Sequence, residues 1–334
     1  MASPRYHSFH RMRQMRNENT VVKRIERAAR SGKTTRCLGI GDDAALWTPT
    51  KGYETILTCD WFLEGTHFLR DKHPAGVVGW KCLARAVSDI AAMGGEPACF
   101  LLSLAVPSSL TGNWLDELLR GLRRASRTFH CELAGGDTTQ WDRVLISITV
   151  IGEARKGRAV LRSGARPGDI LFVSGTLGEA EFGLRQLRKQ RGFARARIVA
   201  ERKHLYPEPR LALGKWLATK RLATAMMDLS DGLSTDLPRL CMASSVGARI
   251  YASSLPVCPL AKAQESTTLA LHGGDDYELL FAVSPSKLRR LPASFRGVRL
   301  TRIGEVTQEK KLVLVENGSA HPLPSGGWDP FREG

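Results

Sequence analysis

Residues 223–233 of this chain are ATAMMDLSDGL. The apolar run ATAMMDL is typical of a buried strand, and the segment from Gly232 to about Ser245 has the spacing of a helix. Asp228 and Asp231 lie where the strand ends and the helix begins. A strand that leads through an acidic turn into a helix indicates a fold in which strands and helices alternate.

The same alternation continues in both directions along the chain. Together with the intervening hairpins, it favours an α+β or mixed α/β fold over a doubly wound sheet. The expected strands cover residues 55–60, 98–107, 131–134, 143–152, 169–175, 248–251 and 277–283, and the expected helices cover 18–31, 75–94, 111–128, 178–203 and 210–219.

The segment LRSGARPGD, residues 161–169, is rich in turn-forming residues and is typical of a boundary between domains. A chain of 334 residues also exceeds the usual size of one domain. We therefore expect a basic extension over residues 1–17, a first domain over 18–155 and a second α/β domain over 156–334.

The charge balance is strongly basic, with 49 Lys and Arg against 33 Asp and Glu and a formal net charge of +16. This balance suits polyanionic partners, so nucleic acid has to be considered. The basic residues are dispersed over expected helix faces, however, which favours a solvated surface. No apolar run approaches the roughly 18 residues of a membrane span, and the seven cysteines lack metal-finger spacing. We expect a cytoplasmic protein with free thiols and with neither a membrane nor a nucleic-acid partner.

The acidic residues carry more information, because many of them follow a strand and a glycine or other small residue. Aspartate beside glycine places a carboxylate close to the main chain, where a ligand can approach. Magnesium prefers oxygen ligands from carboxylates, phosphates and water. One Gly-Asp turn is more often structural than functional. Five such segments in a chain without a Walker loop, kinase loop or hydrolase triad favour a site where several magnesium ions face a polyphosphate.

The sequence also indicates what kind of group would accept a phosphoryl group. Enzymatic phosphoryl transfer depends mainly on positioning and charge neutralisation. When the acceptor is itself a phosphate, its attacking oxygen is already deprotonated near neutral pH. The chain offers no obvious His-carboxylate pair, so we expect neither a covalent nucleophile nor an obligatory general base.

Seven segments carry the strongest pattern: CLGIGDDAAL (37–46), TCDWFLEGTHF (58–68), SDIAAMGGEP (88–97), AGGDTT (134–139), RSGARPGD (162–169), DLSDGL (228–233) and GGDDYELLF (273–281). In this order and spacing they resemble the thiamine-monophosphate kinase family, part of the aminoimidazole-ribonucleotide synthetase-like superfamily. The resemblance implies two α/β domains per subunit and a homodimer whose N-terminal strands join in a barrel. It further implies ATP-dependent phosphorylation of thiamine monophosphate to thiamine diphosphate, assisted by several Mg²⁺ ions.

The resemblance also implies roles for individual residues. The positions that match magnesium ligands are Asp43, Thr58, Cys59, Asp60, Asp89, Asp137, Asp228 and Asp231. Those that match ATP contacts are Gly135, Gly136, Arg162 and Ser230. Those that match contacts to thiamine monophosphate are His67, Asp275 and Trp328.

Three positions depart from the family's usual pattern. Cys59 stands where threonine is common, so only its backbone oxygen could serve as a ligand. Asp275 stands where glutamate is usual, which shortens the side chain by one methylene. Ala86 replaces a frequent asparagine.

Simpler interpretations of several residues remain open. Asp89 follows Arg85 by four positions, so the two could form a surface ion pair on a helix. Asp231 could cap the helix that follows it. His67 could be a packed side chain beside an aromatic residue, and Trp328 could anchor the C-terminal segment.

Two competing functions are less well supported. Other members of the superfamily need a reactive N-terminal cysteine beside a Gly-Lys pair or a C-terminal cysteine, and neither pattern occurs here. A basic nucleic-acid-binding protein with a vestigial nucleotide site should have lost several of the aspartates, yet the acidic set is complete.

Overall fold

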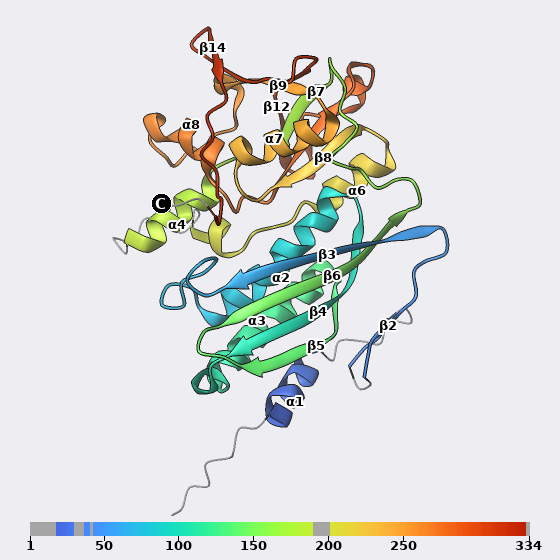
Figure 1. Cartoon of the computed structure of the whole chain (residues 1–334), viewed down its shortest axis with the longest axis vertical. Helices are drawn as coiled ribbons and strands as arrows, with labels where there is room; N and C mark the ends of the chain where they lie inside the picture. The colour runs from blue at the N-terminus through green and yellow to red at the C-terminus, as the bar shows by residue number, and fades with distance from the viewer. Residues whose placement is uncertain (1–17, 30–36, 41–42, 190–200, 332–334) are drawn as a thin grey trace, which may run out of the picture.

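The computed structural model describes residues 18–29, 37–40, 43–189 and 201–331. Two main sheets divide these residues between a lower and an upper half (Figure 1). The predicted extension over residues 1–17 lies outside the described part of the chain.

The lower sheet has four strands, three of them eleven residues long. Their order is β3 (Tyr53–Leu63), β6 (Leu145–Arg155), β4 (Glu96–Val106) and β5 (Glu132–Gln140). β4 and β5 run parallel, whereas the other neighbours are antiparallel. Because side chains alternate along a strand, Thr58 and Asp60 share one face of β3 and Cys59 lies on the other.

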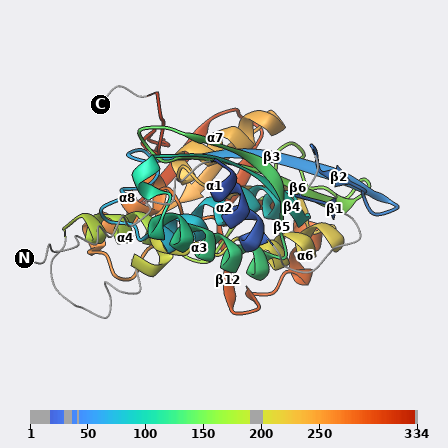
Figure 2. The same cartoon turned by 90° about the horizontal axis from the view of Figure 1, so that it is seen from below.

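Helices α2 (Ala75–Ala92) and α3 (Asn113–Phe129) cover one face of this sheet (Figure 1). The two helices approach closely because Gly79 and Gly121 face the partner helix, where a Cβ atom would overlap backbone atoms. Helix α1 (Glu18–Ala29) packs beside β5 and α3 (Figure 2). β1 (Cys37–Leu38) and β2 (Leu46–Trp47) form a small antiparallel pair.

The opposite face of the lower sheet is open in the single chain. Leu57 and Trp61 of β3 are 68% and 58% exposed. Both lie on the same face as Cys59 because they are two residues away from it. This face is therefore an uncovered sheet surface with large apolar side chains.

The upper sheet is larger and mostly antiparallel. Its order is β14 (Ser319–Pro322), β13 (Leu312–Glu316), β9 (Gly247–Tyr251), β12 (Val298–Thr307), β7 (Ile170–Ser174), β10 (Glu278–Val283) and β8 (Ala223–Leu229), and β11 (Ser294–Phe295) pairs with β12. Helices α7 (Leu233–Ser244) and α8 (Ala263–His272) pack into the core on one face, and α6 (Leu211–Thr219) into the core on the other. Helix α4 (Glu179–Lys189) packs against α8. Short 3₁₀ helices cover residues 108–110, 252–254 and 285–290.

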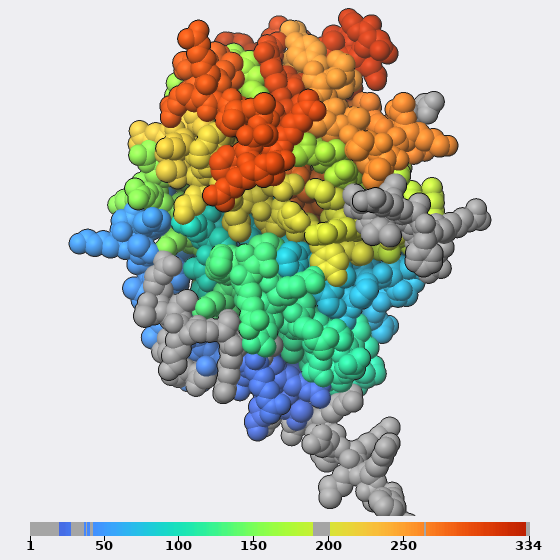
Figure 3. Space-filling view, turned by 180° about the vertical axis from the view of Figure 1, so that it is seen from behind, coloured from blue at the N-terminus to red at the C-terminus, as the bar shows by residue number. Residues whose placement is uncertain are grey.

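The two halves are joined through α6. One apolar cluster includes Ala92 of α2, Leu213 and Leu217 of α6, and Met226 of β8. In the space-filling view the two halves meet along a continuous boundary (Figure 3). Helix α2 thus lies between the lower sheet and the upper half, which places its polar residues beside the end of β8.

The structure has the predicted mixed α/β fold, with differences at particular elements. The helix expected over 178–203 ends at Lys189 as α4, and residues 190–200 lie outside the described part of the chain. Strand β5 runs through the expected Gly-Asp turn as far as Gln140. Helix α8 and strands β12 to β14 had not been predicted. No described helix is long and apolar enough to cross a membrane.

Candidate active site

Carboxylate and hydroxyl side chains meet where β3, α2 and β8 approach one another. The Thr58 hydroxyl donates a hydrogen bond to the carboxylate of Asp89 on α2. Ser88 Oγ, also on α2, donates to Asp228 Oδ2 of β8 at 2.6 Å. The charge of Asp89 acts to raise the pKa of Asp60, and the charge of Asp60 acts to raise the pKa of Asp228, so the three carboxyls lie near one another. The fold thus brings together residues that are far apart in the sequence.

Burial and mutual repulsion shift the pKa values of these carboxyls upward. Burial raises the pKa of Asp60 to about 6, against the opposing influence of Arg85. Burial, followed by the charge of Asp89, raises the pKa of Asp228 to about 8. Burial also raises the pKa of Asp89, although its hydrogen bond from Thr58 acts in the other direction. A cation among these groups would favour their ionised forms.

The donor set fits a hard divalent cation, because all of these groups are oxygen ligands. Among the residues that the structure describes, no three His, Cys, Asp or Glu side chains are grouped so that they could hold an ion by themselves. Mg²⁺ in phosphate-transferring sites is commonly held by one or two carboxylates together with phosphate oxygens and water. The arrangement therefore fits an ion whose coordination a polyphosphate completes.

Cys59 lies apart from its sequence neighbours Thr58 and Asp60. Its thiol is on the open face of the sheet, where Sγ lies 3.3 Å from Ser147 Oγ. A side-chain contribution from Cys59 to an ion held on the α2 side of β3 is therefore excluded. Only its main-chain oxygen remains available.

Asp89 does not form the surface ion pair with Arg85 that the four-residue spacing allowed. It is partly buried and accepts the hydrogen bond from Thr58. No ion pair between Asp89 and Arg85 occurs in the described structure. Asp89 instead faces Thr58 of β3, and Arg85 faces the cavity between the two halves of the molecule.

A second group of predicted residues lines a cavity of about 960 Å³ beside β5: Asp43, Gly135, Gly136 and Asp137. The backbone of Gly136 has φ +148°, and a Cβ atom there would overlap the main chain of Leu102 on β4. Asp137 is exposed, and its Oδ1 accepts a hydrogen bond from the Thr138 N–H at 2.8 Å. The structure places Asp43 and Asp137 in a different cavity from Ser230 and Asp231.

A third group lines a cavity of about 660 Å³ between the two halves of the molecule. Its walls include His67, Arg85, Ser230, Asp231, Asp275 and Trp328. All three residues predicted to contact the substrate therefore face one space. The charges of Asp231 and Asp275 also raise the pKa of Asp60. This cavity consequently adjoins the buried carboxylates around Asp60.

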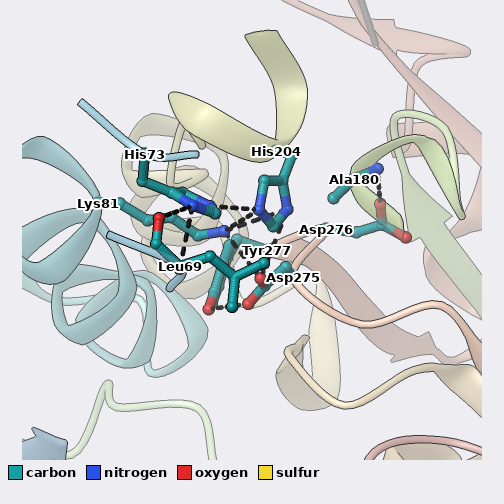
Figure 4. A network of polar contacts seen from close by, with 8 residues as sticks. All are labelled: Leu69, His73, Lys81, Ala180, His204, Asp275, Asp276 and Tyr277. Carbon is teal, nitrogen blue, oxygen red and sulfur yellow. Dashed lines mark hydrogen bonds and ion pairs between the residues drawn. The ribbon is translucent and has the colours of Figure 1, made fainter. Parts of the chain in front are cut away.

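Asp275 is held by two hydrogen bonds at the wall of this cavity (Figure 4). Lys81 Nζ donates to Asp275 Oδ2 at 2.8 Å, and the Tyr277 hydroxyl donates to Oδ1 at 2.7 Å. Burial alone would raise the pKa of Asp275, but the adjacent Lys81 and Arg85 hold that pKa well below its usual range. The carboxylate is thus fixed in its charged form.

Lys81 also contacts a pair of buried histidines (Figure 4). Its Nζ lies 3.2 Å from His204 Nδ1, and His204 Nε2 lies 3.0 Å from His73 Nε2. Burial and the charge of Lys81 lower the pKa of His73 to about 4 and that of His204 to about 2. Sequence reasoning missed all three residues. A lysine inside the apolar run VVGWKCLA was a usable signal for Lys81, because a buried lysine needs a partner.

The adjacent residues Asp275 and Asp276 have different surroundings. Asp276 accepts hydrogen bonds from the N–H groups of Gly178 at 2.6 Å and Ala180 at 3.1 Å, at the start of α4. Asp275 and Tyr277 adopt left-handed backbone conformations, with φ +67° and +51°. Such conformations are uncommon outside glycine. They direct the Asp275 carboxylate into the cavity and the Asp276 carboxylate towards the start of α4.

Asp231 does not cap the helix that follows it. Helix α7 has no side-chain hydrogen bond at its N-cap, and Asp231 Oδ2 instead accepts from Arg239 at 2.6 Å. The N–H groups of Ser230 and Asp231 donate to Asp236 Oδ2. The turn is therefore held by Asp236, which leaves Asp231 and Ser230 at the cavity wall.

His67 presents one ring nitrogen to the protein. Its Nδ1 accepts a hydrogen bond from the Leu63 N–H at 3.0 Å. Burial lowers the pKa of His67 to about 4, and Arg85 contributes to the decrease. The ring is therefore neutral at pH 7, with its proton on Nε2, and can donate a hydrogen bond to a ligand.

Trp328 is fixed by its main chain rather than by its ring. Its N–H donates to the carbonyl oxygen of Asp231 at 2.8 Å, whereas the residue is 47% exposed. A residue that served only as an apolar anchor would bury its ring. The exposed ring at the cavity wall is available to a planar ligand.

Arg162 lies in the connection between the two sheets. Its carbonyl oxygen accepts a hydrogen bond from Ser244 Oγ at 2.9 Å. Its charge is among the influences that lower the pKa of Asp89. The guanidinium is thus positioned beside the buried carboxylates.

Comparison with known proteins gives a consistent result along the chain. Residues 41–154 match the family model of the AIR synthase related protein, N-terminal domain, and residues 166–317 match that of the C-terminal domain. Thiamine-monophosphate kinase of Bacillus subtilis (strain 168) is 36% identical over 88% of this chain and 94% of its own length.

Solved structures agree with these matches. Thiamine-monophosphate kinase from Stenotrophomonas maltophilia K279a has a TM-score of 0.80 at 33% identity, covering 90% of this chain and 96% of its own. A structure described as AaThiL complexed with AMPPCP and TMP has a TM-score of 0.76 at 31% identity, covering 94% and 97%.

Proposed function

The chain belongs to the thiamine-monophosphate kinase family, and we infer that it uses ATP to phosphorylate thiamine monophosphate to thiamine diphosphate. The observation that carries this inference is that the cavity lined by His67 and Trp328 adjoins the buried carboxylates near Asp60. A planar heteroaromatic ring packs favourably on a tryptophan side chain. The phosphate attached to such a ring can then reach the acidic end of the cavity.

The reaction requires no proton to be removed from the acceptor. An oxygen of thiamine monophosphate forms a bond to the γ-phosphorus of ATP while the bond from that phosphorus to the bridging oxygen breaks, and ADP leaves. His67 and His204 are weak bases, with pKa values lowered to about 4 and about 2. The work of the protein is therefore positioning and charge neutralisation.

We propose that the carboxylates beside β5 and those where β3, α2 and β8 meet bind Mg²⁺, which would neutralise phosphate charge during transfer. The proposed ligands are the side chains of Asp43, Thr58, Asp60, Asp89, Asp137, Asp228 and Asp231, with the main-chain oxygen of Cys59. Support comes from the all-oxygen donor set and from the raised pKa values of Asp60 and Asp228.

The remaining site residues are proposed to contact the two substrates. ATP would be bound by Gly135, Gly136, Arg162 and Ser230, and thiamine monophosphate by His67, Asp275 and Trp328. The positive charge of Arg162 beside Asp89 supports a contact to phosphate. The neutral ring of His67 supports hydrogen-bond donation from Nε2 to the acceptor.

We propose that two copies of the chain associate through the open face of the lower sheet, so that their strands form a dimeric barrel. Leu57 and Trp61 are more than half exposed on this face. Burying large apolar side chains of this kind favours association. We place the protein in the cytoplasm because its seven cysteines are all free thiols, as expected in a reducing compartment.

The test is incubation of the purified protein with ATP, MgCl₂ and thiamine monophosphate, followed by chromatography for thiamine diphosphate. Free thiamine in a parallel reaction separates this activity from a kinase that acts on the alcohol. Asp228→Asn should lose turnover, whereas Asp142→Asn, a change at an exposed turn, should retain it. Absence of thiamine diphosphate with the wild-type protein would refute the proposed function.

A further inference from the structure

Arg85 is a cation of the substrate cavity that none of the roles above uses. It lies on α2, one helical turn after Lys81, and lines the cavity that also contains His67, Asp275 and Trp328. Its guanidinium carbon is 5.3 Å from the centre of the Phe62 ring. Its Nε is buried and makes no hydrogen bond to the described residues.

Three other cations near this cavity are held by carboxylates, whereas Arg188, which also lines it, is exposed on α4. Arg239 donates to Asp231 at 2.6 Å, Arg185 donates to Glu181 at 2.7 Å, and Lys81 donates to Asp275 at 2.8 Å. Within the described structure, Arg85 forms neither a hydrogen bond nor an ion pair. Its donors are therefore available at the cavity wall.

An unpaired guanidinium in such a place has an energetic cost. A buried donor without a partner costs free energy because it has lost its water. Nearby Asp60, Asp231 and Asp275 counteract the effect of burial and keep Arg85 charged, yet none of them lies within ion-pair distance. A bound anion would supply the missing partner.

We propose that Arg85 binds the phosphate group of the acceptor substrate, and this inference rests on the proposed function. A guanidinium presents several N–H donors in a planar fork that matches two oxygens of a phosphate. Arg85 lies among Asp60, Asp231 and Asp275, which would otherwise repel the phosphate. It therefore acts as a fixed counter-charge that orients the acceptor oxygen towards ATP.

The acceptor phosphate, rather than ATP, is the group that the position of Arg85 favours. Arg85 shares its cavity with Trp328 and His67, the residues proposed to contact the thiamine portion. Of the residues proposed to contact ATP, Gly135 and Gly136 line the other cavity, whereas Ser230 lies in the cavity of Arg85, where the transferred phosphate has to meet the acceptor. Loss of Arg85 should thus weaken binding of the phosphorylated acceptor selectively.

The experiment compares Arg85→Met with the wild-type protein by isothermal titration calorimetry. Thiamine monophosphate, free thiamine and AMPPCP are titrated separately, each with MgCl₂. We expect affinity for thiamine monophosphate to decrease by about 10- to 100-fold, as for a lost hydrogen bond to a charged group. Affinities for free thiamine and AMPPCP should change by less than about twofold on the same argument.

A matched control is Arg185→Met, which removes the same charge from the same cavity at a residue already paired with Glu181. It should leave the affinity for thiamine monophosphate nearly unchanged. Thermal unfolding checks the fold of each variant, and Arg85→Gln replaces Arg85→Met if the latter does not fold. The same expectations apply to Arg85→Gln.

Three results would overturn the role of Arg85: unchanged affinity for thiamine monophosphate, an equal loss for thiamine and its phosphate, or a selective loss for AMPPCP. If the wild-type protein phosphorylates thiamine monophosphate and Arg85→Met binds it with unchanged affinity, only the role of Arg85 is refuted. Failure of the wild-type protein to phosphorylate thiamine monophosphate refutes the proposed function, whichever variant is used.

Discussion

Replacing Lys81 with methionine should destabilise the protein strongly, because it breaks a buried charge pair. The Lys81 side chain is 0% exposed, and that of Asp275 is 23% exposed. Methionine keeps most of the side-chain volume but leaves Asp275 without the ammonium 2.8 Å away. Removing one member of a buried pair typically costs about 3–5 kcal/mol.

For a domain of this size, each kcal/mol changes the melting temperature by ~2–4 °C, so Tm should fall by about 6 to 20 °C. The assay is thermal unfolding followed by circular dichroism at pH 7. The double variant Lys81→Met/Asp275→Asn should recover part of the loss, because it leaves no unpaired carboxylate.

If Tm decreased by less than about 3 °C, or roughly 1 kcal/mol, Lys81 would not be the necessary partner of Asp275. A double variant less stable than Lys81→Met would show that Asp275 has adequate partners without the ammonium. The contacts to Tyr277 and the positive charge of Arg85 would then be sufficient.

Trp328→Ala should raise KM for thiamine monophosphate about tenfold, as expected for loss of an aromatic contact, with KM for ATP unchanged; a change in KM for ATP alone would contradict the ring contact. In the folded protein the pKa of Asp60 is raised from 3.8 to about 6 and that of Asp228 to about 8. The stability that these protonated carboxyls contribute is therefore complete below about pH 4 and is lost as pH rises through the two raised pKa values. In EDTA, Tm of the wild-type protein should therefore fall more steeply between pH 4 and 8 than Tm of Asp60→Asn/Asp228→Asn, and equal slopes would count against the raised values. Leu57→Arg on the open sheet face should give a monomer in analytical ultracentrifugation, and an unchanged dimer would place the interface elsewhere.

Elements with strong local patterns could be predicted from the sequence. Helix α2 and strands β3 and β4 have long apolar patterns, and their bounds differ from the predictions by only a few residues. Strand β5 was predicted too short because GGDTTQ is rich in turn-forming residues. In the fold, parallel pairing with β4, with Ser103 opposite Asp137, continues the strand through this segment. Such pairing depends on tertiary structure, which local propensity does not report.

The candidate site was predictable in its residue types but not in its grouping. The pattern of aspartates pointed to Asp60 and Asp228, and the family resemblance added Asp89, which the fold brings together with them. Neither could show that Asp43 and Asp137 line another cavity. Contacts such as His73 to His204 join residues 131 positions apart. No local pattern marks a pair of that kind.

The electrostatic problem of the site explains why its cations matter as much as its carboxylates. Two substrates that carry phosphates must meet beside several aspartates. Positive charge therefore has to offset the electrostatic repulsion at the phosphate of each substrate. Lys81 and Arg239 are already matched by Asp275 and Asp231, so their charges are largely cancelled within the protein. Metal ions bound by the proposed acidic ligands would neutralise the phosphates that are transferred. Arg85 forms no ion pair in the described structure, and its charge therefore remains for the acceptor.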